Sequence, residues 1–169
     1  MPDRTVQPTL LQDAIARPGK AQKVLAFTLD DREYAVHIAQ AKEVLDGPSI
    51  TRIPYMPDFL KGAMNLRGEI LCVLDIRPFC GLPSCRRIDS AKVIVTDVTG
   101  SAIGILADRV KGTLEIAPDQ VQAPLSTLDE RIQRHLVGQV RLKDRIVVWL
   151  DFQSILESEP VTRLRGMVG

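Results

Sequence analysis

The stretch that decides the fold is residues 62–77, GAMNLRGEILCVLDIR. Two apolar runs flank a polar block at residues 65–69, and Arg67 and Gly68 lie in the middle of that block. Glycine permits positive φ, and a short polar break between two strand-like runs is typical of a β-hairpin. The segment therefore predicts two antiparallel strands with the charged side chain of Arg67 at or beside the hairpin tip.

Three other segments repeat this pattern of two strand-like runs around a short turn. Their predicted turns are Asp30-Asp31-Arg32, Thr99-Gly100-Ser101 and Lys143-Asp144. Short helical segments are expected after two of the hairpins, one from Asp75 to Gly81 and one that begins near Asp151. The run AKEVL at residues 41–45 is compatible with either a strand or a helix.

Short strands joined by turns, without crossover helices, favour an antiparallel all-β design of barrels or sandwiches. The order of the parts is hairpin, hairpin and helical turn, followed by hairpin, hairpin and helix, which indicates two similar lobes. We expect a flexible N-terminal tail over residues 1–22, one folded domain of two lobes over 23–158, and a C-terminal tail over 159–169.

Composition and charge exclude several classes of function. The chain has 22 Lys and Arg against 21 Asp and Glu, a net charge of +1, and 4% aromatic residues. No excess of one charge favours a polyanion, and the aromatic residues are too few for a row of base-stacking platforms, so nucleic-acid binding is not expected. No run approaches the roughly 18 apolar residues that span a bilayer, so we expect a cytoplasmic protein without direct membrane insertion.

Residue types that carry chemistry occur without a catalytic pattern. The sequence lacks a G-x-S-x-G elbow, a Walker loop and a G-x-G-x-x-G turn. Cys72, Cys80 and Cys85 lack C-x-x-C spacing, and His37 and His135 are too far apart in sequence to indicate a zinc site, so three reduced thiols and no metal are expected. The sequence predicts a binding module without catalytic residues or cofactors, in which Arg67 is the clearest break in the pattern.

Four segments together resemble the successive signatures of the CheW-like family, the coupling proteins of bacterial chemotaxis. They are FTLDDREYAVHIAQAKEVL, TRIPYMPDFLKGAMNLRGEILCVLDIR, KVIVTDVTGSAIGILADRV and LVGQVRLKDRIVVWLDFQSIL, and the likeness runs from about Val24 to Leu156. The resemblance implies two small five-stranded, SH3-like β-barrels packed on a shared hydrophobic seam, with no catalytic activity.

The resemblance also implies partners and partner-facing residues. Family members bridge the cytoplasmic tip of methyl-accepting chemoreceptors to the regulatory domain of a CheA-type histidine kinase, in arrays beneath the inner membrane. Arg67 matches the arginine of the family's NLRG motif, and Glu43 matches the acidic residue that pairs with it. The resemblance places Ala41, Ile70 and Val110 in the receptor groove and gives Gly62 and Gly104 roles in backbone geometry.

One residue departs from the family pattern, and two other functions stay open. Cys72 stands where relatives usually have proline, which adds an N–H donor to the strand and removes a rigid φ. A ligand-binding or enzymatic β-barrel that uses the cleft between lobes would require a deep pocket with converging polar groups. An oligonucleotide-binding barrel would require a basic face that carries aromatic residues.

Overall fold

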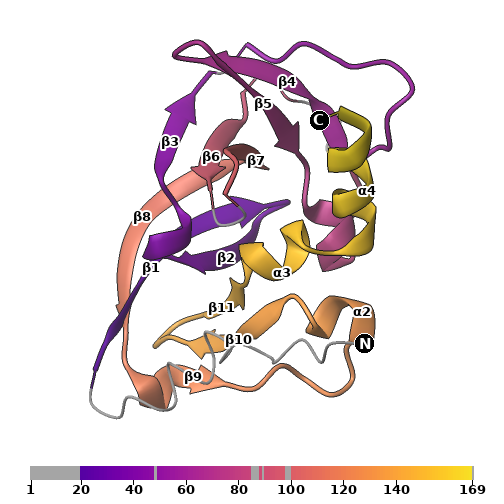
Figure 1. Ribbon diagram of the computed structural model, residues 1–169. Helices are drawn as coiled ribbons and strands as arrows, with labels where there is room; N and C mark the ends of the chain where they lie inside the picture. Colours follow the sequence, from indigo (N-terminus) through magenta and orange to yellow (C-terminus); the bar gives the residue numbers. More distant parts are fainter. Residues whose placement is uncertain (1–19, 48, 85–87, 89, 98–99, 169) are drawn as a thin grey trace.

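The computed structural model describes residues 20–168, except 48, 85–87, 89 and 98–99. The described chain forms eleven strands in two sheets, with short helices at the connections and at the C-terminal end (Figure 1). Most of the expected N-terminal tail, Cys85 and part of the third predicted turn lie outside the described residues. None of the helices in the described part of the chain is long and apolar enough to cross a membrane.

The two sheets contain six and five strands. The six-stranded sheet has the order β8-β1-β2-β11-β10-β9, with β1 Gln22–Leu29, β2 Arg32–His37, β8 Arg109–Ile116, β9 Val121–Gln122, β10 Leu136–Arg141 and β11 Ile146–Leu150. The five-stranded sheet has the order β3-β6-β7-β5-β4, with β3 Glu43–Asp46, β4 Leu60–Leu66, β5 Glu69–Leu74, β6 Lys92–Thr96 and β7 Ile103–Ala107.

The helices in the described part of the chain are short, and two of them have a clear capping residue. They are η1 Ile38–Gln40, η2 Arg77–Cys80, η3 Pro118–Gln120, α2 Glu130–Gln133, α3 Phe152–Leu156 and α4 Glu159–Val168. The carboxylate of Asp151 accepts the N–H groups of Gln153 and Ser154 at 3.0 and 3.4 Å and so caps α3. Gly81, in the left-handed region with φ 77°, ends η2.

All four predicted hairpins are confirmed, and each is antiparallel: β1–β2, β4–β5, β6–β7 and β10–β11. The grouping of consecutive hairpins into lobes, which their order implied, is wrong. The first hairpin joins the last through the parallel pair β2–β11, and the two middle hairpins join through the parallel pair β5–β7. The chain therefore starts in one sheet, builds the other, and returns to the first.

The expectation of two five-stranded SH3-like barrels is not confirmed, because one sheet has six strands and neither sheet is closed. The five-stranded sheet nevertheless curls. Just after β3, Thr51 forms an isolated antiparallel bridge with Ala63 of β4, with both N–H···O distances at 2.8 Å. This bridge brings the two edges of the sheet close to each other.

The largest hydrophobic core lies at the seam where the two sheets meet. It contains side chains from both sheets and from α3 and α4, including Phe27 of β1, Leu74 of β5 and Phe152 of α3. Two smaller clusters belong to single sheets, one around Trp149 and one around Val93. A shared hydrophobic seam is therefore present between two sheets, each of which also has a core of its own.

The C-terminal segment differs from the expected tail. Residues 159–168 form α4, in which Val161 and Leu164 are buried at the seam. Pro160, the second residue of α4, stands in the first turn, where the N–H that proline lacks would have no partner within the helix. In Figure 1, α4 lies beside the five-stranded sheet, close to where β4 begins. Burial of such apolar side chains stabilises by about 2 kcal/mol each, so this segment is part of the fold.

Candidate functional site

Arg67 and Glu43 form an ion pair at one end of the five-stranded sheet. Arg67 and Gly68 form the β4–β5 turn, with φ values of 51° and 88°. Positive φ at both central residues is typical of a type I′ hairpin turn. From this turn, Nη1 and Nη2 of Arg67 donate to the two carboxylate oxygens of Glu43 at 2.9 and 3.0 Å. The pair is therefore bidentate, the geometry that fixes the plane of a guanidinium.

The pair is exposed, but its two members differ. The side chain of Arg67 is 73% exposed and that of Glu43 is 25% exposed. The hydrogen bonds between them lower the pKa of Glu43 and raise the pKa of Arg67. Both groups stay charged near neutral pH. Because exposed pairs contribute little to stability, the main effect of Glu43 is to hold the guanidinium in one orientation facing solvent.

The two predicted glycines occupy tight positions. A Cβ on Gly62 would lie 2.2 Å from the carbonyl oxygen of Thr51, at the bridge that joins the sheet edges, and the φ of Gly62 is 151°. A Cβ on Gly104 would lie 2.7 Å from Cγ1 of Val93. Gly62 is thus required by the close approach of two backbones, and Gly104 by the packing of neighbouring core side chains.

The other predicted partner-facing residues are spread over both sheets. Ile70, in β5, is 70% exposed and belongs to the same hairpin as Arg67. Ala41 lies two residues before Glu43, and Val110 lies on β8 of the six-stranded sheet. Ala41 and Val110 are half-buried against the seam core. The structure therefore gathers Arg67, Glu43 and Ile70 on the five-stranded sheet and places Val110 on the other sheet.

Arg77 is a buried charged residue that the sequence reasoning missed. Its side chain is 1% exposed and contacts three aspartates. Nε donates to Asp30, Nη1 to Asp75 and Nη2 to Asp108, at 3.1, 3.1 and 2.5 Å. Burial alone would lower the pKa of Arg77, but the hydrogen bond to Asp108 and the charge of Asp75 raise it above its ordinary value. The available signal was an arginine that follows the apolar run of β5 after only two residues, one of which is Asp75.

The described thiols and the buried histidine lack the properties of catalytic groups. Burial raises the pKa of Cys72 and raises that of Cys80 to about 12, so both stay protonated. Burial also lowers the pKa of His135 to about 4, and Nδ1 of its ring lies 2.9 Å from Oγ of Ser154. Within the described ranges, no three His, Cys, Asp or Glu side chains are placed to hold a metal ion.

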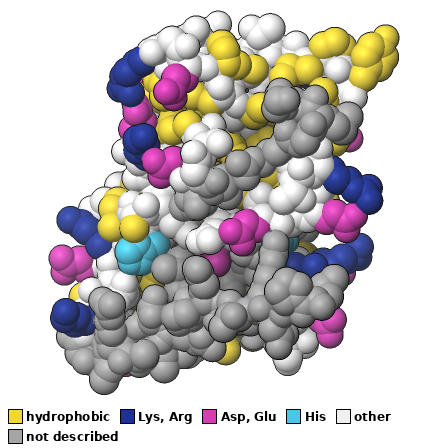
Figure 2. All heavy atoms as spheres, viewed as in Figure 1, with side chains coloured by type: hydrophobic (Ala, Val, Ile, Leu, Met, Phe, Trp, Pro, Cys, Tyr) yellow, Lys and Arg dark blue, Asp and Glu magenta, His cyan; other side chains and the backbone are white. Residues whose placement is uncertain are grey.

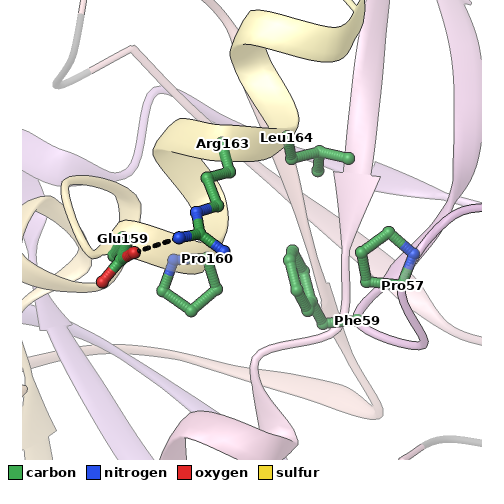
Figure 3. Close-up of a pocket in the computed structure, with 6 residues that line it drawn as sticks. All are labelled: Pro57, Phe59, Glu159, Pro160, Arg163 and Leu164. Atoms are coloured by element: carbon green, nitrogen blue, oxygen red, sulfur yellow. Dashed lines mark ion pairs between the residues drawn. The ribbon is translucent and has the colours of Figure 1, made fainter.

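A cavity of about 420 Å³ lies between the loop before β4 and α4 (Figure 3). Its lining is mainly apolar: Pro57, Phe59, Pro160 and Leu164, with the exposed ion pair of Arg163 and Glu159, 2.7 Å apart. Figure 3 shows Phe59 and Leu164 facing each other across the space. A site for a small substrate requires converging polar groups, and this cavity has one solvated ion pair instead.

Exposed large apolar side chains occur on both halves of the described chain, with three on the five-stranded half and two, Leu125 and Ile146, on the other. Figure 2 shows hydrophobic side chains over the upper part of this face, where Figure 1 places the β4–β5 hairpin, and charges of both signs along the sides. The three on the five-stranded half are Val44 in β3, Tyr55 in the loop between β3 and β4, and Ile70 in β5. Tyr55 is fully exposed and has a φ of 63°, which is rare for an aromatic residue.

Fold and site together define a class of protein: a small two-sheet β protein, joined at one buried seam, that presents an oriented arginine beside exposed apolar residues. The family model of the CheW-like domain matches residues 23–160. The chain belongs to the CheW-like family, as the sequence motifs predicted.

Named relatives agree with this membership. The chain is 30% identical over 138 residues to the chemotaxis protein CheW of Klebsiella aerogenes, covering 82% of this chain and 83% of the relative. It is 31% identical over 149 residues to protein FrzA of Myxococcus xanthus, covering 86% and 90%. Among solved structures, the scaffolding protein TtCheW of Thermoanaerobacter tengcongensis is similar with a TM-score of 0.71 and 25% identity, covering 83% of this chain and 95% of that chain.

Proposed function

We propose that this protein is a non-catalytic adaptor that couples the cytoplasmic tip of a methyl-accepting chemoreceptor to the regulatory domain of a CheA-type histidine kinase. Membership of a family whose named relatives are chemotaxis proteins supports this role. The adaptor works in the cytoplasm and reaches the inner-membrane receptor arrays through its partners. It requires no cofactor, nucleic acid or membrane insertion.

The observation that carries the proposal is the exposed, bidentate pair of Arg67 and Glu43. Arg67 adopts a left-handed conformation that costs a non-glycine residue about 1 kcal/mol, and its ion pair is too exposed to offset much of this through stability. A residue kept in such a conformation is a candidate for a binding role. Oriented arginines and exposed apolar side chains are typical of interface anchors.

The proposed partner surface has a polar and an apolar part. Arg67, held by Glu43, makes the polar contact, and Ile70 adjoins it on the same hairpin. Ala41 and Val110 contribute apolar contacts at the seam, where one face of the receptor's helical tip packs. Gly62 and Gly104 keep the hairpin and its sheet in shape without touching the partner.

The direct test is whether the purified full-length protein binds both partners at once. Sedimentation velocity with a receptor-tip hairpin and the kinase regulatory domain, each added alone and then together, should show two binary complexes and one ternary complex. Binding of only one partner would remove the coupling role. Binding of neither would remove the adaptor role altogether.

A further inference from the structure

Asp108 occupies the junction between the two sheets. It is the single residue between β7, in the five-stranded sheet, and β8, in the six-stranded sheet. In Figure 1, β8 runs from beside β7 down the side of the molecule. The N–H of Asp108 donates to the carbonyl of Thr28 at 2.9 Å, and its Oδ2 accepts the N–H of Asp30 at 2.8 Å. The junction is therefore tied to the β1–β2 hairpin of the six-stranded sheet.

Arg77 connects this junction to both sheets. Its three nitrogens donate to one carboxylate from each part of the structure: Asp75 directly after β5, Asp30 in the β1–β2 turn, and Asp108 at the junction. Asp75 is fully buried, and Nζ of Lys61 lies 3.9 Å from its second oxygen. A guanidinium presents these donors in one rigid plane, so the three carboxylates cannot shift independently.

The conformation of Asp30 is a second, independent observation. Asp30 and Asp31 have φ values of 50° and 66°, the positions of a type I′ turn that Asn and Gly prefer. A non-glycine residue persists in this region where surrounding contacts fix it. Asp30 has such contacts, through its carboxylate to Arg77 and through its N–H to Asp108.

We propose that Arg77 is a positioning residue that sets the orientation of the two sheets relative to each other. The hydrophobic seam holds the sheets together, but apolar contact is non-directional. The ion cluster supplies the directional contacts at the point where the chain crosses from one sheet to the other. If the proposed function holds, Arg77 also sets the spacing between Arg67 on one sheet and Val110 on the other without contacting either partner.

Residual dipolar couplings of the full chain, labelled with ¹⁵N, test this proposal without any partner. The variants are Arg77→Lys, which keeps the charge and loses the planar fork, and Asp30→Gly, which loses the carboxylate and relieves the turn. Asp31→Gly is the matched control, because it changes the next residue of the same turn, for which the described structure gives no bond to Arg77. In Arg77→Lys and Asp30→Gly, the dipolar couplings measured in each sheet should still fit the structure of that sheet. The alignment frames obtained from the two sheets should, however, differ in orientation when both are expressed in the wild-type structure. In the wild type and in Asp31→Gly, a single alignment frame should fit the couplings of both sheets.

One common frame in Arg77→Lys and Asp30→Gly would overturn the proposal and reduce Arg77 to a general stabiliser. If the couplings of one sheet in Asp30→Gly no longer fit the structure of that sheet, the proposal would also be overturned. The ion cluster around Arg77 would then be needed for the internal structure of the sheets and not for their relative orientation. For function, Arg77→Lys should weaken binding of receptor tip and kinase domain together, by roughly tenfold. If the frames differ but wild type binds neither partner, the proposed function fails and the positioning role stands.

Discussion

Arg67 and Glu43 are joined by two hydrogen bonds although they come from opposite sides of a five-stranded sheet. Glu43 begins β3, which is one edge strand, and Arg67 lies in the turn that follows β4, the other edge strand. The two residues meet because the sheet curls, and the bridge between Thr51 and Ala63 joins the same two edges. The orientation of Arg67 is therefore a consequence of the tertiary fold and not of the hairpin alone.

The bridge predicts that Gly62→Ala is strongly destabilising. The new Cβ would lie 2.2 Å from the carbonyl oxygen of Thr51, so one backbone must move. We expect the free energy of unfolding to fall by about 2 kcal/mol or more in urea titrations. Gly47→Ala is the control, because Gly47 also has positive φ but nothing lies within 4 Å of its Cβ position, and it should cost about 1 kcal/mol. Equal losses at the two positions would show that the close approach does not matter.

His135 predicts a loss of stability between pH 6.5 and pH 4. Burial lowers its folded-state pKa to about 4 from 6.5, so the unfolded chain takes up the proton first as the pH falls. The stabilisation is complete above pH 6.5 and is lost toward pH 4, by about 3 kcal/mol at most. The pKa of Glu33 lies below its ordinary 4.5, so protonation of Glu33 lowers stability only at pH values below this window. In urea titrations of His135→Gln, the free energy of unfolding should depend clearly less on pH between pH 6.5 and pH 4 than in the wild type. An unchanged pH dependence would show that other groups cause the loss of stability.

We expect that a proline, which the family resemblance implies at position 72, fits this strand in place of Cys72. The N–H and C=O of Ala63 bond to Thr51, so Ala63 and its partner Cys72 form a non-hydrogen-bonded pair in the β4–β5 ladder. Pairing of β5 with β7 begins at Val73. Cys72→Pro should therefore change the free energy of unfolding by less than about 1 kcal/mol. Leu71→Pro, one residue earlier, removes a ladder hydrogen bond and should abolish the folded state in circular dichroism melts. Comparable damage from both would contradict this assignment.

Tyr55 predicts a stabilising substitution. It is fully exposed at a φ of 63°, a region that Asn tolerates better than an aromatic residue. Tyr55→Asn should raise the free energy of unfolding by about 0.5–1 kcal/mol, read from thermal melts. Ile70→Asn, an exposed strand residue without positive φ, should instead lower it. A lower melting temperature for Tyr55→Asn would show that the ring contributes contacts to the folded state.

Local features of the sequence predicted the hairpins but not their partners. Turns such as Asp30-Asp31 and Arg67-Gly68 act over a few residues, and alternation of apolar residues shows which segments are strands. The parallel pairing of β2 with β11 joins residues more than a hundred positions apart, for example Ala35 and Trp149. Nothing local specifies that pairing, because burial of the seam from both sheets selects it. The structure has two sheets, but the sequence did not indicate which hairpins belong to each of them.

The candidate site divides in the same way. Arg67 and Glu43 could be predicted because a motif identifies them, and the structure shows the bond between them. Arg77 was missed because its partners Asp30 and Asp75 each had a sufficient local explanation, as turn and cap. The helix α4 was missed because its apolar residues, Val161 and Leu164, are few and gain their stability from the seam. The roles of Arg77 and α4 depend on contacts between segments that are distant in the sequence, so they could be recognised only in the structure.

The central claim is that Arg67, held by Glu43, faces a partner. The most direct measurement is the affinity for a receptor-tip hairpin, by isothermal titration calorimetry, of Arg67→Glu and of the charge swap Arg67→Glu with Glu43→Arg. Because the pair is exposed, both variants should melt close to the wild-type temperature. Both should bind at least roughly tenfold more weakly, since the swap restores the ion pair but not the arginine at position 67. Wild-type affinity in Arg67→Glu, or weak binding accompanied by loss of the fold, would contradict the claim.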